Sequence, residues 1–348
     1  MPRLIMKLET EKLLGTLEVL VKNPFLWETE KRGDFNIWNL MISEGCIHLT
    51  DVELAIAHWQ DVEHWGTPTY QTEDDFEYAP FRHEEDDDRD YEYAPFKYDE
   101  DEDEDIWSDE IEAFRVDRYQ QLLTLLKAEL LDLQAFRLTT IEHLKRGHPY
   151  FYFHILIGKT EDGDWFCFSP IVPDQVSDPN HHTERFADNE DWFYFLPTKL
   201  KQEGDRPFTP LKTGDTETNS LNPKTSDLQS KIDAILSELP PITIYGYYGG
   251  GYDYTYKHQI VYATASNKIL AIEKALQAAE MLKLENRDIE FRSNEYNRKL
   301  SQFFQTQLHQ PKTYSLSFWD IGYIYQVAET PTGDWLGVRK MVEFDYNP

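Results

Sequence analysis

Cysteine, basic residues and long apolar runs are all scarce in this sequence. Its 348 residues include only 2 cysteines, Cys46 and Cys167, which excludes a disulfide framework. No apolar run approaches the ~20 residues of a membrane-spanning helix, and Met1–Gly15 contains no signal-peptide core. We therefore expect a cytoplasmic chain with no membrane partner.

Basic residues are outnumbered by acidic ones. The chain has 34 Lys and Arg against 64 Asp and Glu, a formal net charge of -30. A field of this sign repels nucleic acid and anionic membranes, and it attracts basic surfaces. We expect no direct contact with nucleic acid. The expected partner is a basic protein, such as a nuclease or another nucleic-acid-binding protein.

Large apolar side chains, by contrast, are plentiful. Aromatic residues make up 14% of the chain, and the length of 348 residues fits two domains. This composition provides enough apolar surface for hydrophobic cores. It excludes a chain that is disordered throughout.

Much of the negative charge lies in one tract, residues 73–112. It holds 21 acidic and 3 basic residues, a net of -18, which leaves -12 for the rest of the chain. Within it, Phe76-Glu-Tyr-Ala-Pro-Phe81 recurs as Tyr91-Glu-Tyr-Ala-Pro-Phe96. Because like charges at this density repel, we expect a disordered insertion at 71–106.

A second stretch with few large apolar residues, 199–225, is rich in Pro, Thr and Lys and is typical of a linker. It separates a predicted domain at 1–198, which carries the insertion, from one at 226–348. In the first half, the pattern predicts a strand at 35–42 and a long helix at about 110–132. In the second half, it predicts strands at 242–248 and 252–262 around Gly249-Gly-Gly251, then helices near 269–279 and 290–308. The 226–348 range holds a complete set of elements, so we expect it to fold independently.

The two halves match each other near their ends. A shift of 170 residues places Thr160-x-x-Gly-Asp-Trp165 on Thr330-x-x-Gly-Asp-Trp335. A shift of 178 aligns the apolar positions of the two long helices, and Leu138 with Leu316. Alternating apolar residues precede each Gly-Asp turn, as in two strands joined by a hairpin. The order of matches indicates an internal duplication.

The duplicated pattern resembles the nuclease A inhibitor family. The resemblance rests on Tyr314-Ser-Leu316, the alternating strand Tyr323-Ile-Tyr-Gln-Val327 and the turn Glu329-Thr-Pro-Thr-Gly333. It covers most of the second half and, more loosely, the first. The resemblance implies an α+β fold of two tandem three-layer α/β/α sandwich domains on small antiparallel sheets. It also implies tight binding to a non-specific nuclease, with acidic residues approaching the nuclease's metal site.

The candidate partner-binding residues come from two places. The family's inhibitory Glu lies on the loop after the first helix, where the first half has Glu28 and Glu30. The corresponding stretch of the second half, 240–251, contains no acid. There Tyr247, Tyr248 and Tyr252 form either an aromatic binding surface or ordinary sheet packing.

Catalytic and metal-binding patterns are weak. The sequence has no His-Glu-x-x-His and no Cys-x-x-Cys, and the adjacent His181 and His182 point apart in an extended chain. We expect Cys167 to be a small thiol within a strand. We expect no cofactor, no metal and no catalysis. The first hypothesis is a non-enzymatic binding protein, the second a scaffold or assembly factor whose target is not a nuclease, and the third a hydrolase.

Overall fold

The structure is a computed structural model, and it describes residues 7–65, 109–141, 153–171, 184–186, 222–245, 255–285, 295–318 and 321–344. Within these ranges the helices are α1 Leu8–Leu20, α2 Thr29–Arg32, α3 Ile37–Ser43, α4 Val52–Trp65, α5 Asp109–Glu129, α7 Pro223–Ser237, α8 Lys268–Ala278 and α9 Glu295–Gln307. The strands are β1 Phe25–Trp27, β2 Ile47–Thr50, β3 Leu131–Leu138, β4 Phe153–Lys159, β5 Trp165–Pro170, β6 Glu184–Phe186, β7 Ile242–Tyr245, β8 Thr255–His258, β9 Ile260–Ala265, β10 Leu282–Glu285, β11 His309–Ser317, β12 Ile321–Glu329 and β13 Trp335–Phe344. The predicted insertion at 71–106 lies outside these ranges, as do residues 199–221 of the predicted linker.

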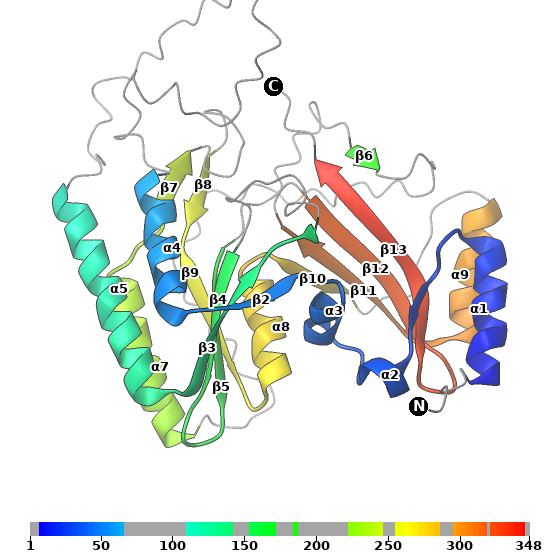
Figure 1. Cartoon of the computed structure of the whole chain (residues 1–348), viewed down its shortest axis with the longest axis horizontal. Helices are drawn as coiled ribbons and strands as arrows, with labels where there is room; N and C mark the ends of the chain where they lie inside the picture. The colour runs from blue at the N-terminus through cyan, green and yellow to red at the C-terminus, as the bar shows by residue number, and fades with distance from the viewer. Residues whose placement is uncertain are drawn as a thin grey trace, which may run out of the picture.

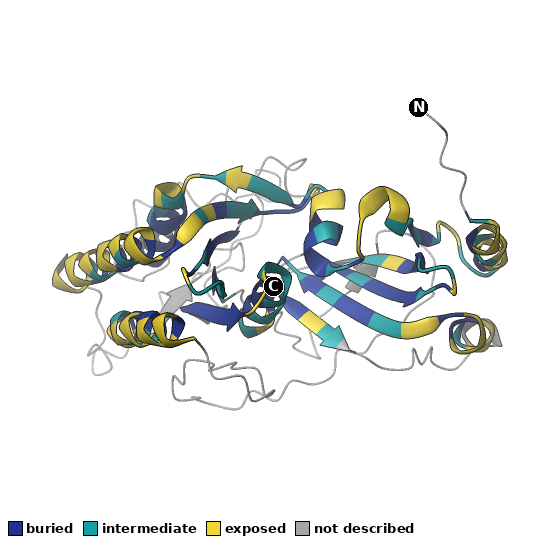
Figure 2. Ribbon diagram, turned by 90° about the horizontal axis from the view of Figure 1, so that it is seen from below, coloured by how far each residue is buried: buried dark blue, intermediate teal, exposed yellow. Residues whose placement is uncertain are grey.

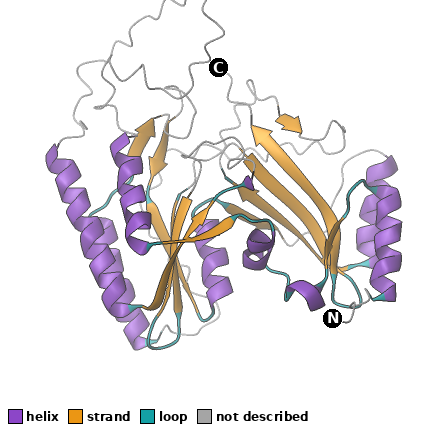
Figure 3. Ribbon diagram, in the orientation of Figure 1, coloured by secondary structure: helices purple, strands orange, loops and turns teal. Residues whose placement is uncertain are grey.

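Two antiparallel sheets form the frame, so the predicted α+β class is confirmed (Figure 3). In the first sheet the strand order is β2-β3-β4-β5-β9. In the second it is β1-β13-β12-β11-β10, with β6 also pairing with β13. Strands β7 and β8 make a separate two-stranded antiparallel sheet. None of the described helices is long and apolar enough to cross a membrane.

Helices and sheets alternate in layers (Figure 1). Helices α4, α5 and α7 cover the outer face of the first sheet, and α1 and α9 cover the outer face of the second. Helices α3 and α8 lie between the sheets. One apolar cluster there contains side chains of these two helices and of both sheets. The outer helices expose their far faces to solvent, whereas the strands are largely buried (Figure 2). Each sheet is thus covered on both faces, as the three-layer sandwich requires.

The two-residue period of the strands explains this arrangement. On β4, Ile155 and Ile157 join the central cluster, whereas Leu156 packs against the outer helices. Successive side chains of a strand point to opposite faces. Strand β4 is therefore apolar on both faces, as expected for a sheet with helices on both sides.

The strand register supports the internal duplication. Phe136 pairs with Ile155 in the first sheet, and Tyr314 pairs with Tyr325 in the second. These partners are related by the shifts of 178 and 170 residues found in the sequence. Helices α3 and α8 also begin alike, because the side chain of Asn36 accepts a hydrogen bond from Asn39 N and that of Asn267 accepts one from Leu270 N, both at 2.9 Å.

The sheets do not follow the predicted division into 1–198 and 226–348. Strand β1, from the first copy, pairs with β13, so Trp27 lies opposite Trp335. Strand β9, from the second copy, pairs with β5, so Ala265 lies opposite Trp165. The preceding helices are exchanged as well, because α1 packs on α9 and α7 packs on α5. We call residues 8–27 the first arm and residues 223–265 the second arm. This exchange argues against independent folding of 226–348. The domain boundaries predicted from the two sequence copies remain a prediction.

Two local predictions were wrong. Residues 35–42, predicted as a strand, contain the start of α3, because the side chain of Asn36 accepts a hydrogen bond from Asn39 N and begins a helix there. The predicted strand at 252–262 is divided at Gln259 between β8 and β9, which pair with different strands. The Gly249-Gly-Gly251 turn lies outside the described residues.

Candidate functional site

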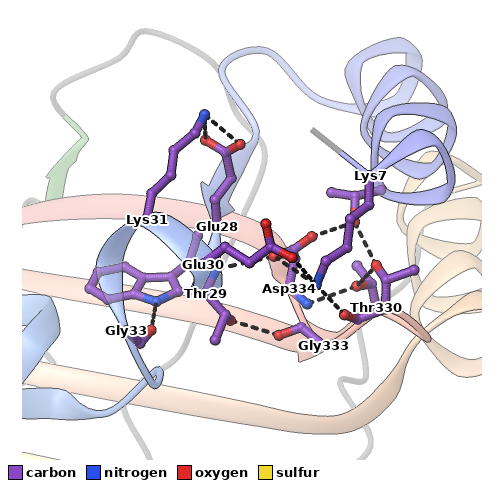
Figure 4. Close-up of polar contacts among 12 residues, drawn as sticks. Lys7, Glu28, Thr29, Glu30, Lys31, Gly33, Thr330, Gly333 and Asp334 are labelled. Carbon is purple, nitrogen blue, oxygen red and sulfur yellow. Dashed lines mark hydrogen bonds and ion pairs between the residues drawn. The ribbon is translucent and has the colours of Figure 1, made fainter. Parts of the chain in front are cut away.

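The two predicted acids lie beside the hairpin turn between β12 and β13 (Figure 4). Glu28 precedes α2, and its carboxylate is 2.6 Å from Nζ of Lys31. Glu30 lies in α2, with its carboxylate 3.5 Å from Nζ of Lys7. Each acid therefore has a lysine partner, and the negative charge of this loop is largely compensated.

The same turn holds the first arm in place. Gly333 has φ +85°, a conformation that favours glycine, and Asp334 N donates to Thr330 Oγ1 at 3.0 Å. The Asp334 carboxylate, which is 2% exposed, accepts hydrogen bonds from Thr10 Oγ1 at 2.7 Å and from Thr29 N at 3.0 Å. We call Thr10, Thr29 and Asp334 the first latch. It fastens the start of α1 and the start of α2, which follows β1, to the other copy.

The duplicated turn makes the equivalent connection to the second arm. Gly163 has φ +99°, and Asp164 accepts from Thr225 Oγ1 at 2.8 Å and from Asn222 Nδ2 at 3.0 Å. Thr225 near the start of α7 thus takes the place that Thr10 has near the start of α1. We call Asn222, Thr225 and Asp164 the second latch. The Thr-x-x-Gly-Asp-Trp repeat, which the sequence indicates only as a hairpin, also joins the two copies.

A buried ion pair holds the two helices between which the acidic tract is inserted. Glu63 on α4 and Arg115 on α5 form two hydrogen bonds, of 2.7 and 2.8 Å, and are 1% and 4% exposed. Tyr119 OH donates to Glu63 at 2.6 Å, and Arg115 donates to the carbonyl oxygen of Pro240 at 3.0 Å. We call Glu63, Arg115 and Tyr119 the insertion root. A buried pair is stabilising only when its remaining polar atoms are bonded, as they are here.

One buried histidine, His258, lies beside the insertion root, and two more, His58 and His154, have ring centroids 4.6 Å apart. His258 Nε2 is 3.9 Å from Glu63 Oε1, yet burial lowers the pKa of His258 to about 4. Burial likewise lowers the pKa of His154 to about 4 and places that of His58 well below its ordinary value. These imidazoles are neutral at pH 7 and add no positive charge near the insertion.

The first turns of α5 carry a feature that the sequence argument missed. Ile111 and Phe114 lie within the first two turns of α5, which begins at Asp109. They are 41% and 45% exposed. Glu110 between them and the insertion is exposed as well. The signal was present in the sequence as one apolar residue at the end of the acidic tract, Ile111, and another just beyond it, Phe114.

The tyrosine candidates remain predictions, and Cys167 does not fit a reactive site. Tyr247, Tyr248 and Tyr252 fall within 246–254, outside the described residues. Cys167 is buried, and burial raises the pKa of its thiol, so it is not a poised nucleophile. Among the side chains that the structure describes, no three His, Cys, Asp or Glu residues gather as metal ligands.

Comparison with known proteins adds no family. No protein-family model, curated protein or solved structure matches this chain.

Proposed function

We propose that this chain is a non-enzymatic acidic protein that binds a basic protein partner, with a nuclease or another nucleic-acid-binding protein as the first candidate. The observation that carries the proposal is the position of the acidic tract. Most of it falls in the sequence between Trp65, where α4 ends, and Asp109, where α5 begins, and these two helix ends lie at one end of the packed α4–α5 pair (Figure 1). The insertion root fixes both helices at that end.

Charge supports a steering role for the tract. Its -18 is more than half of the chain's -30. Interactions between exposed charges fade over about 8 Å at physiological ionic strength. Steering of this kind raises the association rate more than it lowers the dissociation rate. Residues that retain the partner would lie on the fold, and Ile111 and Phe114 supply exposed apolar surface next to the tract.

A second candidate is a scaffold or assembly factor whose target is not a nuclease. Ion pairing of the two loop acids favours it. Glu28 and Glu30 each face a lysine, whereas carboxylates that approach a nuclease's metal must be available. Either function fits the cytoplasm, since both cysteines are free thiols.

Binding and inhibition should be measured together. The full chain is titrated against a basic non-specific nuclease and against a basic protein without nuclease activity, at two salt concentrations. The first candidate predicts tight binding to the nuclease and loss of DNA cleavage. Binding to both proteins with unchanged cleavage supports the scaffold function. Binding to neither at low salt would refute the proposal.

Two matched variants separate charge from anchoring. In one, the acids of 73–105 are replaced by Asn and Gln. We expect slower association and a flatter salt dependence, with little change in dissociation. In the other, Phe114→Ser leaves the tract intact and should speed dissociation without altering the salt slope. Identical effects of the two variants on both rates would contradict the division of roles.

A further inference from the structure

Each arm covers apolar surface that belongs to the other copy. The first arm places Leu17, which is 0% exposed, against a cluster from α9, β12 and β13. The members contributed by that second copy are Leu300, Phe303, Phe304, Leu308, Ala328, Leu336 and Val338. Without the arm, this face and the β13 edge at Trp335–Gly337 would be open to solvent. An apolar face beside an unpaired strand edge is a site for strand addition.

The second arm is integrated at least as deeply. Strand β9 pairs with β5 from Trp165 to Pro170. Leu228, Ile232 and Leu236 of α7 join the outer cluster of the first sheet. On its other face, β9 contributes Ala263 and Ala265 to the central cluster. Withdrawing this arm would therefore open the first sheet on both faces.

We propose that the two halves of the chain are obligate binding partners, each recognising the other's arm. Each recognition surface is defined by strand pairing, an apolar helix face and a carboxylate latch, which is buried at Asp334 and half-buried at Asp164. This inference does not depend on the identity of the external partner. A chain cut within 199–221 should remain a 1:1 complex of two fragments that separates only by unfolding. Two rigid domains in surface contact would instead separate without unfolding.

The test uses the full chain with a protease site at about residue 210, cleaved after folding. None of the described helices or strands includes this position. Light scattering should give the mass of the intact chain, and dilution to nanomolar concentration should not release folded fragments. Melting of cut and uncut chains verifies that the cut itself leaves the fold intact.

Fragment exchange decides between interlocking and surface contact. Cut protein carrying a fluorescent second fragment is mixed with unlabelled cut protein in mild urea, and exchange is followed beside unfolding. We expect the two rates to agree, because an arm leaves only when its sheet opens. Asp334→Ala, which weakens the first latch, should raise both rates by the same factor. Exchange much faster than unfolding, or separate folded monomers on dilution, would overturn the proposal.

Discussion

Removing the carboxylate of Asp334 should destabilise the whole fold. The side chain is 2% exposed and accepts hydrogen bonds of 2.7 Å from Thr10 Oγ1 and 3.0 Å from Thr29 N. Hydrogen bonds to a charged group contribute roughly 1.5–3 kcal/mol each. For two such bonds, Asp334→Ala should therefore lower the free energy of unfolding by about 3–6 kcal/mol. Asp334→Asn retains an acceptor for Thr29 N and a donor for Thr10, so its loss should be about 1 kcal/mol.

Asp164→Ala is the matched control in the second latch. Asp164 is half-buried, and one of its donors, Asn222 Nδ2, forms an exposed hydrogen bond that water can replace. We expect a loss of only about 1–2 kcal/mol. Urea unfolding of the three variants, followed by tryptophan fluorescence and by circular dichroism, measures these differences. Equal losses for Asp334→Ala and Asp164→Ala, or a first-latch loss below ~1 kcal/mol, would refute the reasoning.

Three further predictions test the core. Glu63→Gln should cost about 3–5 kcal/mol because it leaves Arg115 charged and buried, whereas replacing both residues by apolar ones should cost much less; urea unfolding measures both. His258 has a folded pKa of about 4 against an ordinary 6.5, so its contribution to stability is present above pH 6.5 and is lost as pH falls toward 4, at ~3 kcal/mol in full. The unfolding free energy of His258→Gln should therefore fall less steeply over this pH range than that of the wild type. Gly337→Ala would place a Cβ 2.0 Å from the Gln326 carbonyl oxygen and should prevent normal folding, whereas Gly15→Ala on α1 has open space and should raise the melting temperature slightly.

Local patterns predicted much of the fold. The long helices, the alternating strands and the Gly-Asp turns depend on neighbours in sequence, and their repetition predicted the duplication and its register. The segment at 35–42 failed because aromatic and branched residues favour a strand, while a single capping residue, Asn36, begins a helix. Strand propensity is a weak guide to secondary structure over so short a stretch.

The exchange of arms could not be predicted in this way. Strand β1 has the same local sequence whether it pairs with β5 or with β13, and only the tertiary structure selects between them. The same holds for the candidate site. Glu28 and Glu30 were identified as acids on a loop, but Lys7 compensates Glu30 only because the first arm lies against the second copy. The remaining Tyr candidates lie outside the described residues and remain predictions.

The duplicated turns have a consequence for how the two copies can change in evolution. A gene that encodes two independent domains can lose or rearrange one of them. Here, loss of either copy would leave a sheet without its edge strand. Thr10 is bonded to Asp334, 324 residues away, and Thr225 to Asp164, 61 residues away, so we expect each pair to change together. Between β2 and α5 the first copy has 58 residues, 51–108, which include α4, against 9 between β10 and α9 in the second, 286–294. We expect the two copies to diverge in that segment.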